Sequence, residues 1–146
     1  LQFKKITRMP EIHGIQARGS SVIFKAMSSG NFKEQSAETV ADSISVNTPS
    51  NGYLALKNLK AYGGHCITLT DKEILSAQKE LSASCGLFSE PAAAAAYAGF
   101  IKQKQNLDSN STCVILLTGN GLKDIISASK NLLMPDKTIN SLNELN

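Results

Sequence analysis

The chain has 146 residues and a mass of 15.6 kDa, enough for one domain or for part of a larger one. Hydrophobic residues make up 42% of it and charged residues 18%, which excludes a disordered or a fibrous protein. No apolar run approaches the roughly 18 residues of a transmembrane helix. We therefore expect a soluble, cytoplasmic protein that does not interact with a membrane.

The net charge of +3 is concentrated near the N-terminus, where residues 1–35 carry six basic and two acidic side chains. Such a basic segment can indicate nucleic-acid binding. Here the basic residues are not interleaved with an aromatic stacking platform, and the chain contains no tryptophan. We expect a solvated terminal segment and no nucleic-acid partner.

Three cysteines, Cys66, Cys85 and Cys113, are too widely spaced for a structural zinc site or a disulfide framework, and neither histidine lies in a ligand motif. The sequence therefore predicts no metal site. Because all three cysteines have apolar neighbours, we expect them to be small buried side chains in a reducing compartment.

Strand and helix patterns alternate along the chain. In order, we expect a strand at 12–17, a helix at 20–28, an ambiguous segment at 39–46, a helix at 53–62, a strand at 65–69, helices at 73–85 and 91–104, a strand at 112–117, and a helix from Leu122. Thr70 and Glu73 have the spacing of a capping box at the start of the helix at 73–85. This alternation predicts a layered α/β fold.

The strand predicted at 112–117 is a continuous apolar run rather than an alternating one. A continuous run is typical of a strand that is covered on both faces, as in the centre of a parallel sheet. We expect the strands at 12–17, 65–69 and 112–117 to be parallel neighbours in one sheet, with the helices packed on it.

The segment Thr118–Gly121, Thr-Gly-Asn-Gly, follows that strand directly. Ligands of open parallel sheets bind beyond the carboxyl ends of the strands, and two glycines allow a close approach of the backbone to a ligand. A tight strand-to-helix turn that needs glycine for its backbone angles explains the tetrapeptide equally well. A single Gly-x-Gly does not decide between the two.

Five alanines at 92–96 follow Glu90-Pro91. A helix face with so little bulk suits close approach by a flat ligand or by another backbone. High helix propensity next to a crowded sheet is the simpler explanation. In the same way, Glu90 at a helix start is favourable because of the helix dipole alone.

Two motifs together resemble the C-terminal half of the threonine synthase family. Glu90-Pro91 followed by small residues is similar to that family's Glu-Pro-Ser-Ser-Ala-Ala, and residues 117–124, Leu-Thr-Gly-Asn-Gly-Leu-Lys-Asp, are similar to its Leu-Thr-Gly-His-Gly-Leu-Lys-Asp. Three weaker matches, at 10–17, 39–44 and 47–49, occur in the family's order. The resemblance covers residues 10–125.

The resemblance implies a three-layer αβα fold with a parallel sheet, the C-terminal half of the large domain of a fold-type II pyridoxal-phosphate enzyme. Residues 1–146 are then a single partial domain of the cofactor-binding part, and 126–146 its C-terminal tail. The implied activity is that of a lyase of amino-acid biosynthesis that converts O-phosphohomoserine and water to threonine and phosphate. The implied cofactor is pyridoxal 5'-phosphate, and the substrate is a small-molecule amino acid.

Carried over residue by residue, the resemblance places the hydroxyl of Thr118 at the pyridine nitrogen of the cofactor. Gly119 and Asn120 line the same edge of the ring, and Glu90 lies near the ring. The chain departs from the family where two serines after Glu-Pro are alanines and where Asn120 replaces a histidine. These departures leave open a related lyase that resembles threonine dehydratase or cysteate synthase.

No catalytic residue is assigned within this chain. The family's Schiff-base lysine lies in an upstream Ser-Phe-Lys-Asp type of motif, and Lys33, the superficial match, follows an asparagine and lies after the Gln-Ala strand. No glycine run is present that would hold the phosphate. We therefore expect a fragment that is inactive by itself, whose partner is the rest of the same enzyme chain.

The absence of an initial methionine agrees with a processed or truncated chain. A non-catalytic α/β interaction domain is the alternative, and a homodimer stays open.

Overall fold

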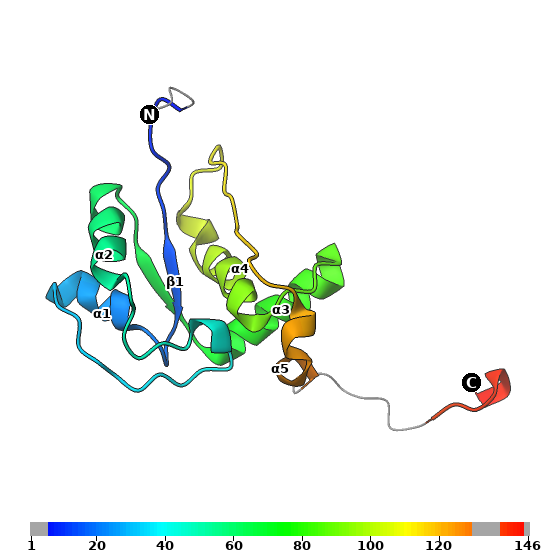
Figure 1. The fold of residues 1–146 in the computed structure, drawn as a ribbon. Helices are drawn as coiled ribbons and strands as arrows, with labels where there is room; N and C mark the ends of the chain where they lie inside the picture. Colours follow the sequence, from blue (N-terminus) through cyan, green and yellow to red (C-terminus); the bar gives the residue numbers. More distant parts are fainter. Residues whose placement is uncertain (1–5, 130–137, 145–146) are drawn as a thin grey trace.

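Two short parallel strands lie at the centre of the computed structural model, which describes residues 6–129 and 138–144 (Figure 1). Strand β1 spans Gly14–Ala17 and strand β2 spans Cys66–Leu69. Their register pairs Gly14 with Cys66 and Ala17 with Leu69. Both strands were predicted, and their parallel orientation is confirmed.

Five α-helices and four 3-10 turns surround the strands within the described residues. The helices are α1 (Val22–Ser29), α2 (Gly52–Ala61), α3 (Asp71–Cys85), α4 (Pro91–Gln103) and α5 (Ile125–Ser129), and the turns are η1 (Asp42–Ile44), η2 (Lys104–Asn106), η3 (Gly121–Asp124) and η4 (Leu142–Glu144). The predicted helices at 20–28, 53–62, 73–85 and 91–104 are confirmed to within two residues at each end. The ambiguous segment 39–46 contains η1, and the helix expected from Leu122 consists of η3 and α5.

The helices cover both faces of the strand pair (Figure 1). Successive residues of a strand point to opposite faces, so the neighbours of Gly14 and Ile15 identify the two layers. A Cβ atom on Gly14 would contact Leu59 of α2, whereas Ile15 lies directly against Gly99 of α4. The strands therefore lie between α1 and α2 on one face and α3 and α4 on the other.

The start of α3 shows the predicted capping box. The Thr70 hydroxyl accepts a hydrogen bond from the Glu73 amide at 3.2 Å, and the Glu73 carboxylate accepts one from the Thr70 amide at 2.6 Å. The helix ends at Gly86, whose φ of 66° is left-handed.

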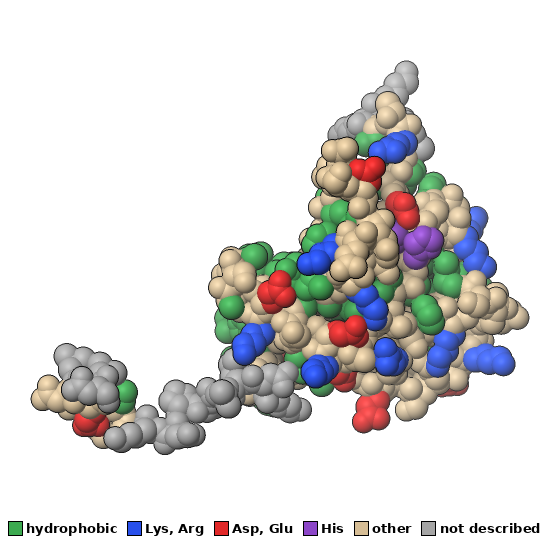
Figure 2. Space-filling view, turned by 180° about the vertical axis from the view of Figure 1, so that it is seen from behind, with side chains coloured by type: hydrophobic (Ala, Val, Ile, Leu, Met, Phe, Trp, Pro, Cys, Tyr) green, Lys and Arg blue, Asp and Glu red, His purple; other side chains and the backbone are tan. Residues whose placement is uncertain are grey.

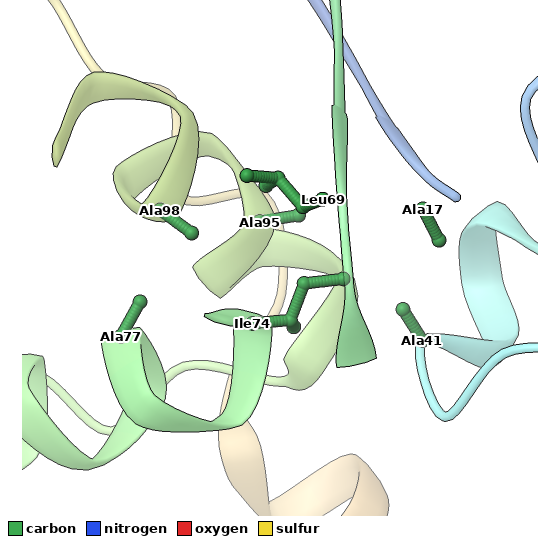
Figure 3. Close-up of a cluster of buried hydrophobic side chains, with 7 residues drawn as sticks. All are labelled: Ala17, Ala41, Leu69, Ile74, Ala77, Ala95 and Ala98. Atoms are coloured by element: carbon green, nitrogen blue, oxygen red, sulfur yellow. The ribbon is translucent and has the colours of Figure 1, made fainter. Parts of the chain in front are cut away.

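Small side chains dominate the core between the strands and α4. The buried cluster in Figure 3 consists of Ala17, Ala41, Leu69, Ile74, Ala77, Ala95 and Ala98. A Cβ atom on Gly99 would lie within 2.9 Å of Cγ1 of Ile15, so α4 reaches the sheet only because its inner face is small. The small residues of α4 thus allow close packing on the strands, which is the close approach by another backbone that the alanine run suggested.

The predicted central strand at 112–117 is wrong for this structure, since the segment is irregular coil. Val114 is 82% exposed and Leu116 71% exposed, whereas the prediction required both faces to be covered. A strand needs a neighbouring backbone for its hydrogen bonds, and the described residues supply none to this segment. In Figure 1 it runs alongside α4 and is not paired with β1 or β2.

The cysteine prediction is correct for Cys66 and wrong for the other two. Cys66 is buried in β2, where burial raises the pKa of its thiol to about 11. Cys85 and Cys113 are exposed, because one ends α3 next to Gly86 and the other lies in the unpaired segment 112–117. An apolar sequence neighbourhood does not ensure burial at a helix end or in a coil.

No helix among the described residues is long and apolar enough to cross a membrane, and no group of three potential ligands in that part of the chain could hold a metal ion. On the face shown in Figure 2, basic and acidic side chains both occur across the surface. Of the predicted tail at 126–146, residues 130–137 and 145–146 lie outside the described residues.

Candidate functional site

Two segments that lie about 30 residues apart in the sequence meet at the N-terminus of α4. Ser89 and Asn120 form an isolated antiparallel bridge. The Glu90 amide donates to the Gly119 carbonyl at 3.0 Å, and the Gly121 amide donates to the Phe88 carbonyl at 2.9 Å. We call residues 88–90 together with 119–123 the clasp. It brings Glu90 next to Thr118–Gly121, the residues on which the sequence analysis centred the cofactor site.

Both glycines of the clasp are needed for space. A Cβ atom on Gly121 would lie 2.6 Å from the ring of Phe88, and one on Gly119 would overlap the Glu90 carboxylate and lie 2.8 Å from its Cγ. Neither glycine has a positive φ, since those described are Gly30, Gly63 and Gly86. The alternative that the turn needs glycine for its angles is therefore wrong. The groups that approach these glycines closely are the ring of Phe88 and the carboxylate of Glu90.

The Glu90 side chain is only 7% exposed and has charged and polar neighbours from two other segments. Lys123 of η3 places its ammonium 3.1 Å from Oε2 of Glu90, and the Ser43 hydroxyl of η1 donates to the same oxygen at 3.4 Å. Glu90 is the N-cap residue of α4, but its side chain makes no capping hydrogen bond. Helix-dipole stabilisation alone therefore does not account for this carboxylate, which is held by an ion pair.

Thr118 and Asn120 have different surroundings from Gly119. The side-chain oxygen of Asn120 accepts a hydrogen bond from the Leu122 backbone amide at 2.8 Å and caps η3. This oxygen therefore already has a partner within the chain. Thr118 is exposed, and among the described residues no hydrogen bond involves its hydroxyl. That hydroxyl is consequently free to bind a group that approaches from outside.

Three residues of this site were not predicted from the sequence. Lys123 and Ser43 contact Glu90, and Phe88 packs on Gly121. Lys123 was visible inside the motif at 117–124, and its charge was the signal that could have identified it as a partner for Glu90. Nothing in the sequence pattern indicated Ser43, which arrives from η1 through the tertiary fold.

Ser89 is a further feature of the clasp. Its backbone carbonyl accepts a hydrogen bond from the Gln78 side chain at 2.7 Å, and both side chains are buried. Its own hydroxyl is buried and has no partner within the described part of the chain. The interior side of the clasp therefore keeps an unused polar atom next to Glu90.

The sequence pattern of the family described as "Pyridoxal-phosphate dependent enzyme" matches residues 1–119. Threonine synthase from Synechocystis sp. is 37% identical over 133 residues, 89% of this chain and 34% of the relative. Threonine synthase from Methanosarcina acetivorans is 37% identical over 144 residues, 93% of this chain and 36% of the relative. The chain thus spans about a third of the length of the curated relatives it matches.

Solved structures are similar in fold at low identity. The threonine deaminase of T.th. matches with a TM-score of 0.63 at 17% identity, over 74% of this chain and 39% of that one. Maize serine racemase matches with a TM-score of 0.64 at 16% identity, over 82% and 36%. These likenesses confirm the predicted fold class, the layered α/β fold with a parallel sheet of fold-type II enzymes.

Proposed function

Because this chain belongs to the family of pyridoxal-phosphate dependent enzymes, we propose that it forms the C-terminal part of the cofactor-binding large domain of a threonine synthase. The proposed activity is the conversion of O-phosphohomoserine and water to threonine and phosphate. The observation that carries the proposal is the identity of 37% to threonine synthases over about nine-tenths of the chain. Structural neighbours that act on serine or threonine are only 16–17% identical, which supports the fold alone.

The residues at the end of segment 112–117 fit one edge of a pyridoxal ring. The hydroxyl of Thr118 is exposed and has no protein partner among the described residues, and it can both donate to and accept from a ring nitrogen. At Gly119 the space that a Cβ would fill holds the Glu90 carboxylate, so the fit to the ring depends on the Thr118 hydroxyl. We therefore assign Thr118 to the pyridine nitrogen, with Gly119 and Asn120 along the same edge.

When bound, the cofactor supplies an electron sink for the amino-acid substrate. A neutral hydroxyl at the ring nitrogen, in place of a carboxylate, does not stabilise a proton there. Thr118 therefore sets a milder electron sink. The ion-paired Glu90 contacts Lys123 and Ser43 in the structure, so in our proposal it shapes the site without supplying a proton to the ring nitrogen.

The lysine and the phosphate-binding loop come from elsewhere in our proposal. Lys123 contacts the site, but its ammonium is engaged with Glu90. We propose that the rest of the same enzyme chain supplies both groups, in agreement with the one-third coverage of the relatives. By itself, the 146-residue chain is then inactive.

The experiment compares Thr118→Val with the parent in the full-length protein. Valine keeps the shape and removes the hydroxyl, which leaves the ring nitrogen without a partner at a cost of about 1–3 kcal/mol. Threonine and phosphate formation should fall about ten- to a hundredfold, while the cofactor stays bound through the groups supplied elsewhere. Thr112→Val, the same change at the exposed start of this segment, is the control and should turn over like the parent.

Two results would contradict the proposal. If the parent releases ammonia from threonine or serine and forms no threonine from O-phosphohomoserine, the chain belongs to a related lyase. If it does not bind pyridoxal phosphate at all, the alternative of a non-catalytic interaction domain holds. Equal turnover of parent and Thr118→Val would leave the activity intact but remove Thr118 from the site.

A further inference from the structure

We propose that Lys123 is a positioning residue of this site. Its ammonium holds the buried Glu90 carboxylate, and through that carboxylate it fixes where the turn that carries Thr118 lies relative to α4. The consequence for the reaction rests on the proposed function, whereas the coupling between Lys123 and Glu90 does not.

The burial of Glu90 makes its charge partner important. A carboxylate that is 7% exposed has lost most of its hydration and needs a compensating cation. Among the described residues, Lys123 is the cation that contacts it, at 3.1 Å. The other polar contact, from the Ser43 hydroxyl at 3.4 Å, is long for a hydrogen bond. Lys123 therefore supplies most of the compensation.

The geometry connects this ion pair to the position of Thr118. The Glu90 side chain is pressed against the Cα atom of Gly119, where even a methyl group has no room. Lys123, four residues further along the same turn, contacts the carboxylate from η3. The turn thus contacts Glu90 through both Gly119 and Lys123. Because Thr118 directly precedes Gly119, its position follows from this arrangement.

Stability alone does not explain the pair. The Lys123 side chain is 62% exposed, so solvent screens the attraction, and burial of the Glu90 carboxylate costs hydration that this attraction must offset. The pair favours one position of η3 relative to α4. The Glu90 carboxylate at the start of α4 and the Lys123 ammonium on η3 attract each other strongly only while the two segments of the clasp are in contact. The two backbone hydrogen bonds of the clasp fix which residues pair at the Ser89–Asn120 bridge, and in our proposal the ion pair fixes where the turn lies beside α4.

The test uses five variants of the full-length protein: Lys123→Met, Lys123→Arg, Glu90→Gln, Glu90→Gln with Lys123→Met, and Lys57→Met. Lys57 is exposed on α2 and has no ion pair in the described part of the chain, so Lys57→Met is the matched control. For each variant we would measure urea unfolding, kcat and KM, and the absorbance spectrum of the bound cofactor.

We expect Lys123→Met to lower kcat about tenfold while KM stays within about twofold of the parent. The absorbance maximum of the bound cofactor should shift, because Thr118 no longer meets the ring nitrogen in the same geometry. Lys123→Arg keeps the charge and should restore both kcat and the spectrum. Lys57→Met should match the parent in all three measurements.

A residue with a merely structural role would change the unfolding curve and leave the spectrum and kcat of the folded enzyme unaltered, and that result would overturn the proposal. A failure of Lys123→Arg to restore the spectrum would overturn it as well.

If the parent makes no threonine, the proposed function fails and the unfolding data decide the coupling. Glu90→Gln should then recover at least part of the stability lost in Lys123→Met, since no buried charge remains unpaired. Strictly additive effects of the two substitutions would refute the coupling.

Discussion

Replacing Gly121 with alanine should destabilise the chain, although alanine usually stabilises a site that it can occupy. The φ of Gly121 is not left-handed, so the backbone accepts an alanine, and the reduced freedom of the unfolded chain favours it by about 0.4–1 kcal/mol. Against this, the new Cβ would lie 2.6–2.7 Å from three atoms of the Phe88 ring. Ordinary contact begins at 3.4 Å, so the edge of a rigid ring must move.

Phe88, whose ring must move, is also hydrogen-bonded to Gly121 through its backbone. The Phe88 carbonyl accepts the Gly121 amide at 2.9 Å, so the ring moves away only by leaving its present rotamer or by stretching this hydrogen bond. Overpacking of this kind costs about 1–3 kcal/mol, which exceeds the gain in the unfolded state. We expect a net loss of about 1–2 kcal/mol in the free energy of unfolding.

Urea denaturation followed by circular dichroism measures this loss. Gly14→Ala is the matched control, because a Cβ atom on Gly14 would make an ordinary contact at 3.6 Å with Leu59. Phe88→Leu combined with Gly121→Ala should recover part of the stability, since the flexible side chain can move away. If Gly121→Ala is as stable as the parent, or if the double substitution brings no recovery, the packing argument for the clasp is refuted.

Two further predictions concern titratable groups. Because burial raises the pKa of the Cys66 thiol to about 11, we expect a thiol reagent at pH 8 to modify the exposed Cys85 and Cys113 quickly and Cys66 only slowly; three equal rates would contradict this. The backbone hydrogen bond from Thr70 lowers the pKa of Glu73 to about 2. The stability that this bond contributes is therefore present above the unfolded pKa of about 4.3 and is lost as the pH falls towards 2. Urea midpoints measured between these limits should fall less steeply in Glu73→Gln than in the parent, and equal slopes would rule out this source.

Local sequence signals determined much of the fold. The capping box at Thr70 and Glu73, and the glycine that ends α3, are interactions within one helix, so the residue types alone predict them. The boundaries of α1, α2 and α4 were also predicted from local spacing, although none of their N-cap residues makes a side-chain capping hydrogen bond. The parallel orientation of β1 and β2 followed from the alternation of strands and helices.

The segment 112–117 shows the limit of such signals. Its unbroken apolar run predicted a covered strand, but covering requires neighbouring backbone and side chains that a single segment does not contain. The described residues leave Val114 and Leu116 exposed. An apolar run therefore indicates that burial of the segment would be favourable. Only the tertiary structure shows whether the segment is buried.

By itself, the sequence identified Glu90 and residues 118–120 as candidates for the site, because their motifs are local in the chain, but it did not identify Phe88, Ser43 or Lys123. Only the tertiary structure decided how they meet. It placed the Glu90 carboxylate over Gly119, paired it with Lys123, and left the Thr118 hydroxyl exposed. The physical reason is that ion pairing and close packing depend on distances across the fold, and residues about 30 positions apart in the sequence carry no local signal of such distances.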